Sequence, residues 1–115
     1  MKIHKQKPDD GTKAISAAFE GHKSLKHCIV VDDDINIYNP HEVEWAIATR
    51  FQADKNAIIL SKQPGSSLDP SGDLSEGKKA TTAKAGLDAT IPAVSTGKGF
   101  TKEQYRKVDL KKFLP

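Results

Sequence analysis

The segment from Lys26 to Phe51 constrains the fold of this 115-residue chain more than any other. It begins with a short, continuous apolar run, Cys28 to Val31, that is rich in β-branched residues. Continuous apolarity is typical of a strand covered on both faces, as in α/β proteins. Three consecutive acids, Asp32, Asp33 and Asp34, end the run abruptly, so we expect them at the carboxyl end of a buried strand.

A capped amphipathic helix is predicted to follow this strand. Asn39 is a good N-cap, Pro40 suits the first helical position, and Glu42 completes the spacing of a capping box with Asn39. Apolar residues then recur at helical spacing and give the helix one apolar face: Val43, Ala46, Ile47 and Phe51. A second apolar run, Ala57 to Leu60, predicts another short strand. The order strand, helix, strand predicts a right-handed parallel crossover.

The segments on either side are less strongly patterned. Residues 1–6 are a weak strand candidate, and residues 12–22 have the apolar spacing of a helix that ends near Gly21. From residue 62 to 99 Gly, Ser, Thr, Pro and Lys dominate, which predicts a long, partly mobile loop with a short edge strand at Gly86–Pro92. Residues 101–114 are predicted to form a helical tail whose apolar side chains need a packing partner.

Together these elements predict a small α/β domain of two or three layers. It has a short, mostly parallel sheet, two main helices, a long polar loop and a C-terminal helical tail. The predicted organisation is one domain over residues 1–99, with the loop at 62–99, and the tail at 100–115. At 115 residues the core can only be modest.

Composition excludes several classes of protein. The formal net charge is only +3, from 18 basic and 15 acidic residues. The sequence has no basic patch interleaved with aromatic residues, so it does not indicate a nucleic-acid binder. No apolar run approaches the length of a membrane span. Cys28 is the single cysteine, so an internal disulfide is excluded and a reducing, cytoplasmic setting is expected.

No catalytic or metal-binding constellation emerges from the residues themselves. Asp32, Asp34 and Asn36 match the first three ligand positions of an EF-hand loop, but Ile37 and Val43 stand where that loop needs Gly and Glu. Ion pairing of these acids, with Arg50 among the partners, is the favoured interpretation. Cys28 lies inside an apolar strand, where a thiol has a raised pKa and is usually inert. We therefore assign no catalytic residue and no metal ligand.

Four separated blocks occur in an order that resembles one known family. They are VDDDI (31–35), EVEWAIATRF (42–51), SLDP (67–70) and GLDATIP (86–92). Over residues 3–92 the chain resembles the C-terminal domain of the UbiD family, and the archaeal members in particular. These are carboxy-lyases that decarboxylate unsaturated or aromatic acids with prenylated FMN.

The resemblance implies that the catalytic residues and most of the cofactor site lie outside this chain. In the complete enzyme prenylated FMN, a divalent metal and potassium would be held by earlier domains. This chain would then be either a domain or a separately encoded subunit. It would partner the flavin-binding part, support a homo-oligomer and reach a neighbouring subunit with its tail helix. Two substrates remain open, an anhydromevalonate phosphate and a polyprenyl-hydroxybenzoate.

One residue is a candidate for cofactor binding. Gly21-His22-Lys23 resembles a GHK-like block that precedes the same strand in some family members, where the lysine contacts the cofactor phosphate. A lysine ammonium is a compact point charge that suits a phosphate. The alternative is that Lys23 is a solvated surface residue.

Two other functions remain open. The absence of catalytic motifs and the small size fit a free-standing binding or regulatory module that kept the fold without the enzyme. A small nucleotide or metal binder is a third possibility, although Gly97-Lys98-Gly99 and Gly77-Lys78-Lys79 both fail the phosphate-loop pattern.

Overall fold

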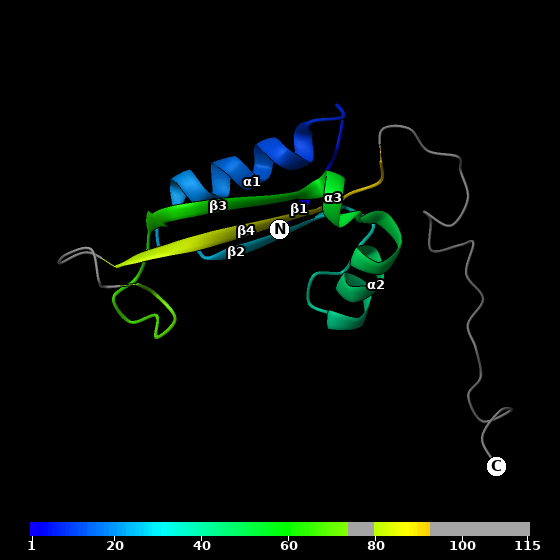
Figure 1. Cartoon of the computed structure of the whole chain (residues 1–115). Coiled ribbons are helices and arrows are strands. Elements are labelled where there is room, and N and C mark those ends of the chain that lie inside the picture. The colour runs from blue at the N-terminus through cyan, green and yellow to red at the C-terminus, as the bar shows by residue number, and fades with distance from the viewer. Residues whose placement is uncertain (74–79, 93–115) are drawn as a thin grey trace, which may run out of the picture.

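The computed structural model describes residues 1–73 and 80–92. Within them the chain forms, in order, β1 (Lys2–Ile3), α1 (Asp10–Gly21), β2 (His27–Asp32), α2 (Pro40–Arg50), α3 (Ala53–Asn56), β3 (Ala57–Pro64) and β4 (Thr81–Ala89). The strands form one sheet in the order β1-β2-β4-β3 (Figure 1). The α/β class is confirmed, and two of the three strand pairings are parallel, as predicted. The predicted tail at 100–115 lies outside the described residues.

The predicted parallel crossover from β2 to β3 is wrong. β4 pairs with β2 in parallel, and β3 pairs with the far side of β4 in antiparallel register, with Ile58 opposite Gly86. The second half of β3, Ser61 to Pro64, is polar and includes a proline, which suits an edge strand and not a central one. The helix between β2 and β3 therefore leads to the edge of the sheet.

The short edge strand predicted at Gly86–Pro92 is instead a nine-residue central strand, Thr81–Ala89, inside the range predicted as loop. Apart from Leu87 its side chains are small or polar, so no apolar run signals burial. Burial nevertheless reaches Lys84 and Asp88, at 4% and 5% exposed. A small side chain in the centre of the sheet lets the covering helix approach closely, and Gly86 lies directly beneath Ile15 of α1.

Helix α1 covers one face of the sheet (Figure 1). Ile15 and Phe19 pack there against Cys28 and Val30 of β2, with Ile58 and Leu60 of β3 at the margin. The apolar face predicted for residues 12–22 is confirmed. Cys28 is buried in this cluster, and burial raises the pKa of its thiol, as predicted from its place in an apolar strand.

Helix α2 packs against one end of the opposite face (Figure 1). A second apolar cluster joins Val31, Ile35 and Ala89 to Ala46 of α2. The predicted N-cap is confirmed, because Asn39 Oδ1 accepts a hydrogen bond from the His41 N–H at 3.1 Å. The Glu42 carboxylate accepts a hydrogen bond from the backbone N–H of Asn36 at 3.2 Å. In a capping box the donor would be the backbone N–H of Asn39, three residues later. No helix in residues 1–73 and 80–92 combines the length and apolarity needed to cross a bilayer.

We expect Gly86→Ala to destabilise the domain by about 1–3 kcal/mol, because the new methyl group would overlap the Cγ2 atom of Ile15 and force α1 away from the sheet. Urea unfolding followed by circular dichroism measures the change. Gly21→Ala is the matched control, because a methyl group there meets nothing within 4 Å, and we expect it to leave stability unchanged or raised by about 0.5 kcal/mol. Equal stability of the two variants would contradict the close packing at Gly86.

Candidate functional site

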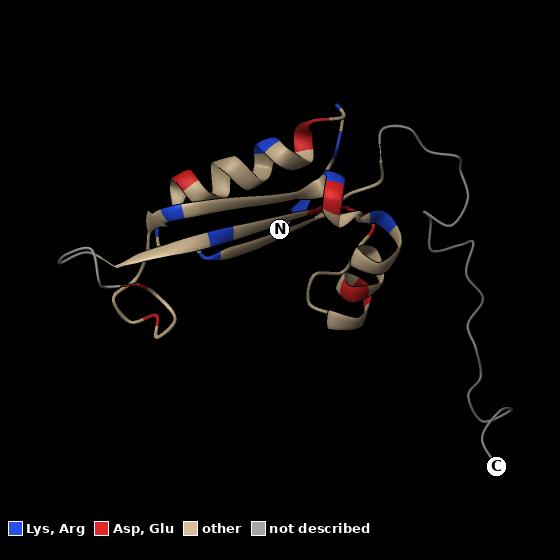
Figure 2. Cartoon of the chain, viewed as in Figure 1, with Lys and Arg blue, Asp and Glu red and all other residues tan. Residues whose placement is uncertain are grey.

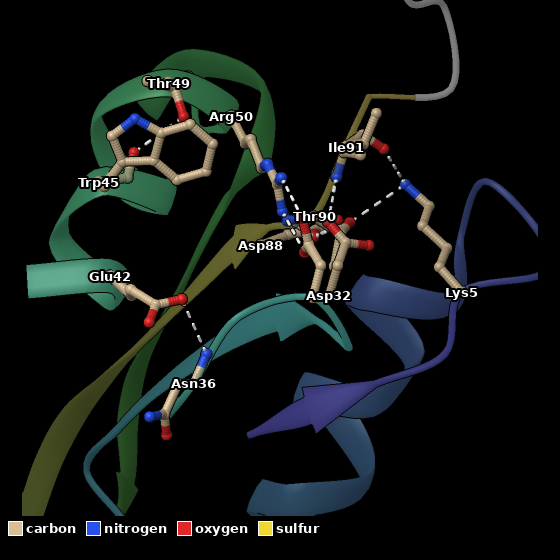
Figure 3. A network of polar contacts seen from close by, with 11 residues as sticks. Lys5, Asp32, Asn36, Glu42, Trp45, Thr49, Arg50, Asp88, Thr90 and Ile91 are labelled. Carbon is tan, nitrogen blue, oxygen red and sulfur yellow. Dashed lines mark hydrogen bonds and ion pairs between the residues drawn. The ribbon is translucent and has the colours of Figure 1, made fainter. Parts of the chain in front are cut away.

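A polar network joins the carboxyl ends of β2 and β4 to the end of α2 (Figure 3). Its centre is Arg50, the last residue of α2, whose side chain is fully buried. The Arg50 Nη1 atom lies 3.0 Å from Asp32 Oδ2, and Nη2 lies 2.8 Å from Asp34 Oδ2. Arg50 Nη1 also donates to Asp34 Oδ1 at 2.9 Å, so the Arg50–Asp34 ion pair is bidentate. The predicted pairing of these acids with Arg50 is confirmed.

The same network anchors the chain where it leaves β4 (Figure 3). The Ile91 N–H donates to Asp32 Oδ2 at 2.8 Å. From the N-terminal segment, Lys5 Nζ donates to the Ile91 carbonyl at 2.8 Å and to Thr90 Oγ1 at 3.1 Å. Asp88 in turn accepts from the Thr90 backbone N–H at 3.1 Å. Hydrogen bonds therefore join segments that are far apart in sequence at the carboxyl ends of β2 and β4.

The electrostatics of the network are those of a structural support. Burial raises the pKa of the Asp32 carboxyl, although the Ile91 N–H and Arg50 oppose the shift. Burial also disfavours the Arg50 charge, but Asp34 and Asp32 outweigh burial and raise the pKa of the guanidinium. Asp32 and Asp34, considered above as calcium ligands, direct their oxygen atoms to Arg50. Within the described ranges no group of three or more His, Cys, Asp or Glu residues is placed to hold a metal ion.

Lys23 lies at a different place, in the turn between α1 and β2. Its side chain is exposed and borders an open groove of about 380 Å³. The groove is lined by the end of α1, by β3 and by β4: Ser16, Phe19, Glu20, Lys23, Leu60, Gln63, Pro64 and Lys84. A lysine ammonium beside a partly apolar groove can bind a phosphate joined to an apolar organic group. The residues present are thus compatible with contact to the phosphate of a flavin.

Sequence analysis missed Lys84 and Asp88 as buried charged residues. The signal that could have found them is the alternation in Lys84, Gly86 and Asp88, which places all three on the α1 face of β4. Figure 2 shows the basic segment within β4, and elsewhere basic and acidic residues are interspersed over the described elements.

Comparison with known proteins identifies the family. Residues 1–89 match the family model of the 3-octaprenyl-4-hydroxybenzoate carboxy-lyase C-terminal domain, UbiD_C. The chain therefore belongs to the UbiD family, and the part it matches is the C-terminal domain. This finding confirms the resemblance drawn from the four sequence blocks.

Relatives with known names are decarboxylases. The chain is 52% identical over 102 residues to the anhydromevalonate phosphate decarboxylase of Methanocaldococcus jannaschii, covering 89% of this chain and 24% of the relative. It is 51% identical over 100 residues to the enzyme of that name in Aeropyrum pernix, covering 87% of this chain and 22% of the relative. The chain thus spans about a quarter of the length of the curated relatives it matches.

Solved structures agree. The UbiD-class enzyme HmfF from Pelotomaculum thermopropionicum, in complex with FMN, superposes with a TM-score of 0.77 at 36% identity, covering 99% of this chain and 24% of that one. The 3,4-dihydroxybenzoic acid decarboxylase of Enterobacter cloacae gives the same TM-score at 26% identity, covering 97% and 24%.

We expect Arg50→Met to lower the free energy of unfolding by about 3–5 kcal/mol, because it leaves Asp32 as a buried, uncompensated carboxylate. Urea unfolding at neutral pH measures the loss. Adding Asp32→Asn and Asp34→Asn to the same chain should restore most of it, since the uncompensated charges are then gone.

Lys13→Met is the control for this experiment. It breaks an exposed pair with Asp9 on α1 and should cost less than about 1 kcal/mol. A loss for Arg50→Met as small as that of the control would show that the buried network contributes little to stability.

Proposed function

We propose that this chain is the C-terminal domain of a carboxy-lyase that decarboxylates anhydromevalonate phosphate. The observation that supports this substrate is the gradient of similarity among relatives. Identity to five archaeal anhydromevalonate phosphate decarboxylases is 52%, 51%, 51%, 47% and 44%, whereas identity to the gallate decarboxylase of Lactiplantibacillus plantarum is 35%. This gradient favours anhydromevalonate phosphate over gallate as the substrate.

The proposed cofactor is prenylated FMN, held mainly by the rest of the enzyme. HmfF, a UbiD-class neighbour, has been solved with FMN and, in an evolved dimeric form, with prenylated FMN. When bound, this cofactor supplies the group that activates the substrate for loss of CO₂. The role proposed for this chain is narrower: Lys23, exposed beside the groove, contacts the cofactor phosphate. The proposed setting is the cytoplasm, and the metal and potassium of the complete enzyme belong to the flavin-binding part.

The second proposed role is assembly. Several large apolar side chains remain exposed in the described part of the chain, notably Tyr38 and Leu68 at 89% and Ile59 at 72%. Ile58 and Leu60 pack beneath α1, so alternation along β3 places Ile59 on the opposite face of the sheet, which α2 covers only at one end. Burial of such residues against another domain or subunit is favourable by about 25 cal/mol per Å² of apolar surface.

The main experiment is recovery of the polypeptide that contains this sequence from its source cells, through an affinity tag at its C-terminus. We expect a flavin in the native mass spectrum and release of CO₂ from anhydromevalonate phosphate, because the catalytic groups accompany this domain. The recombinant 115-residue chain, as the control, should release none.

Two results would reject the proposal. Turnover by the isolated chain would place catalysis within it. Recovery of the 12.5 kDa chain or its homo-oligomer, with no flavin and no partner, would favour the free-standing binding module. Gallate and a polyprenyl-hydroxybenzoate, assayed in parallel, test the choice of substrate.

We expect Ile59→Lys to lower the mass of the assembled enzyme in multi-angle light scattering, because a charge would then have to be buried in the interface. Ile59 is 72% exposed in the domain, so the free energy of unfolding of the isolated chain should stay within about 0.5 kcal/mol of the parent. Lys55→Met, on the exposed surface of α3, is the control. An unchanged mass would exclude this face from the interface.

A further inference from the structure

Lys84 is unusual among the lysines that the structure describes because it is almost completely buried. It lies in the middle of the central strand β4 and is 4% exposed. Its ammonium donates to the backbone carbonyl of Lys23 and lies 5.5 Å from the centroid of the Phe19 ring. In the described part of the chain no carboxylate pairs with it, although burial of an ammonium is normally balanced by an opposite charge.

The hydrogen bond from Lys84 also fixes the position of Lys23. The two residues are 61 positions apart in sequence, and Lys23 follows immediately after the C-cap residue His22. A turn closed by the Leu25 N–H and the His22 carbonyl, at 3.0 Å, holds the same segment from the other side. The Lys23 backbone is thus held between the end of α1 and the central strand, while its side chain remains exposed.

Both lysines line the groove, and its other walls define what can fit. Phe19, Leu60 and Pro64 supply apolar surface, while Ser16 and Gln63 supply neutral hydrogen-bonding groups. Among the described residues that line the groove Glu20 is the one acid, so these residues carry two positive charges and one negative charge. An anion joined to an apolar body fits this combination better than a cation or a wholly polar solute.

We propose that Lys84 and Lys23 form one site for a phosphate monoester, in which Lys84 supplies a fixed buried charge and holds Lys23 in place. This inference rests on the proposed contact between Lys23 and the cofactor phosphate. It adds a second residue to that contact, a positioning residue on the strand that sequence analysis took for loop. The simpler role of Lys84, a cation at the C-terminal end of α1, accounts for the single carbonyl bond but requires no ligand.

The test is a titration of the 115-residue chain with inorganic phosphate and with FMN, followed by amide and lysine Nζ chemical shifts in NMR spectra. We expect shifts centred on residues 22–25 and on Lys84. Lys84→Met keeps the unbranched apolar stem beside Phe19 and removes the charge, and it should weaken binding of both ligands at least about tenfold. Lys23→Met should weaken binding by a similar factor.

Three further variants separate charge from packing. Lys84→Arg keeps the charge and should bind better than Lys84→Met. Lys84→Gln keeps an N–H donor for the Lys23 carbonyl but no charge, and it replaces Lys84→Met if that variant does not fold. Lys13→Met makes the same change in net charge and should stay within about twofold of the parent, because Lys13 pairs with Asp9 and is not among the residues that line the groove.

The outcomes distinguish this inference from the function on which it rests. Weaker binding in Lys23→Met, with parent-like binding in a folded Lys84→Met, would overturn the inference and leave the role of Lys23 intact. No binding of either ligand by the parent chain would overturn both. FMN binding that is tighter than phosphate binding supports the cofactor as the source of the phosphate. Equal affinities support a site for the phosphate group alone.

Discussion

The buried guanidinium of Arg50 is the group on which the arrangement of this domain depends. It ends α2, faces Asp32 at the end of β2, and bridges to Asp34 in the loop that leads into α2. Asp32 in turn accepts the Ile91 N–H, which sets the direction of the chain beyond β4. A buried charge that loses a partner is strongly destabilising, so the stability of this end of the domain depends on all of these contacts.

The sheet shows a second constraint, the close approach of α1 to β4. Gly86 leaves room for Ile15, and Gly11 at the start of α1 leaves room for the carboxyl group of Asp88. Both glycines permit a helix to lie directly on a central strand that has few large side chains of its own. A strand of this composition has weak sequence signals. Lys84, on the face beneath the helix, is buried.

The Arg50 network and the groove beside Lys23 and Lys84 have different roles. The Arg50 network uses its charges within the domain and holds the ends of strands together. The groove beside Lys23 and Lys84 lies at the other end of α1, and its described lining residues carry two positive charges and one negative charge. The curated relatives are about four times as long as this chain, and the groove is the site proposed above for the cofactor phosphate.

Local sequence determined much of this protein. Local patterns were sufficient to predict β2, α2 and the pairing of Arg50 with the acids. These patterns are the apolar run before Asp32, the Asn39 cap and the spacing of Ala46 and Ile47. They were sufficient because the residues involved are close together in the sequence. The four ordered sequence blocks were sufficient to identify the family. The order of the strands was decided only by tertiary structure. Apart from Leu87, β4 has small and polar side chains, so its central place follows from packing against Ile15 and from hydrogen bonds to β2 and β3, neither of which is local in sequence. The contact between Lys84 and Lys23 arises in the same way, because only the folded sheet brings residues 61 positions apart together.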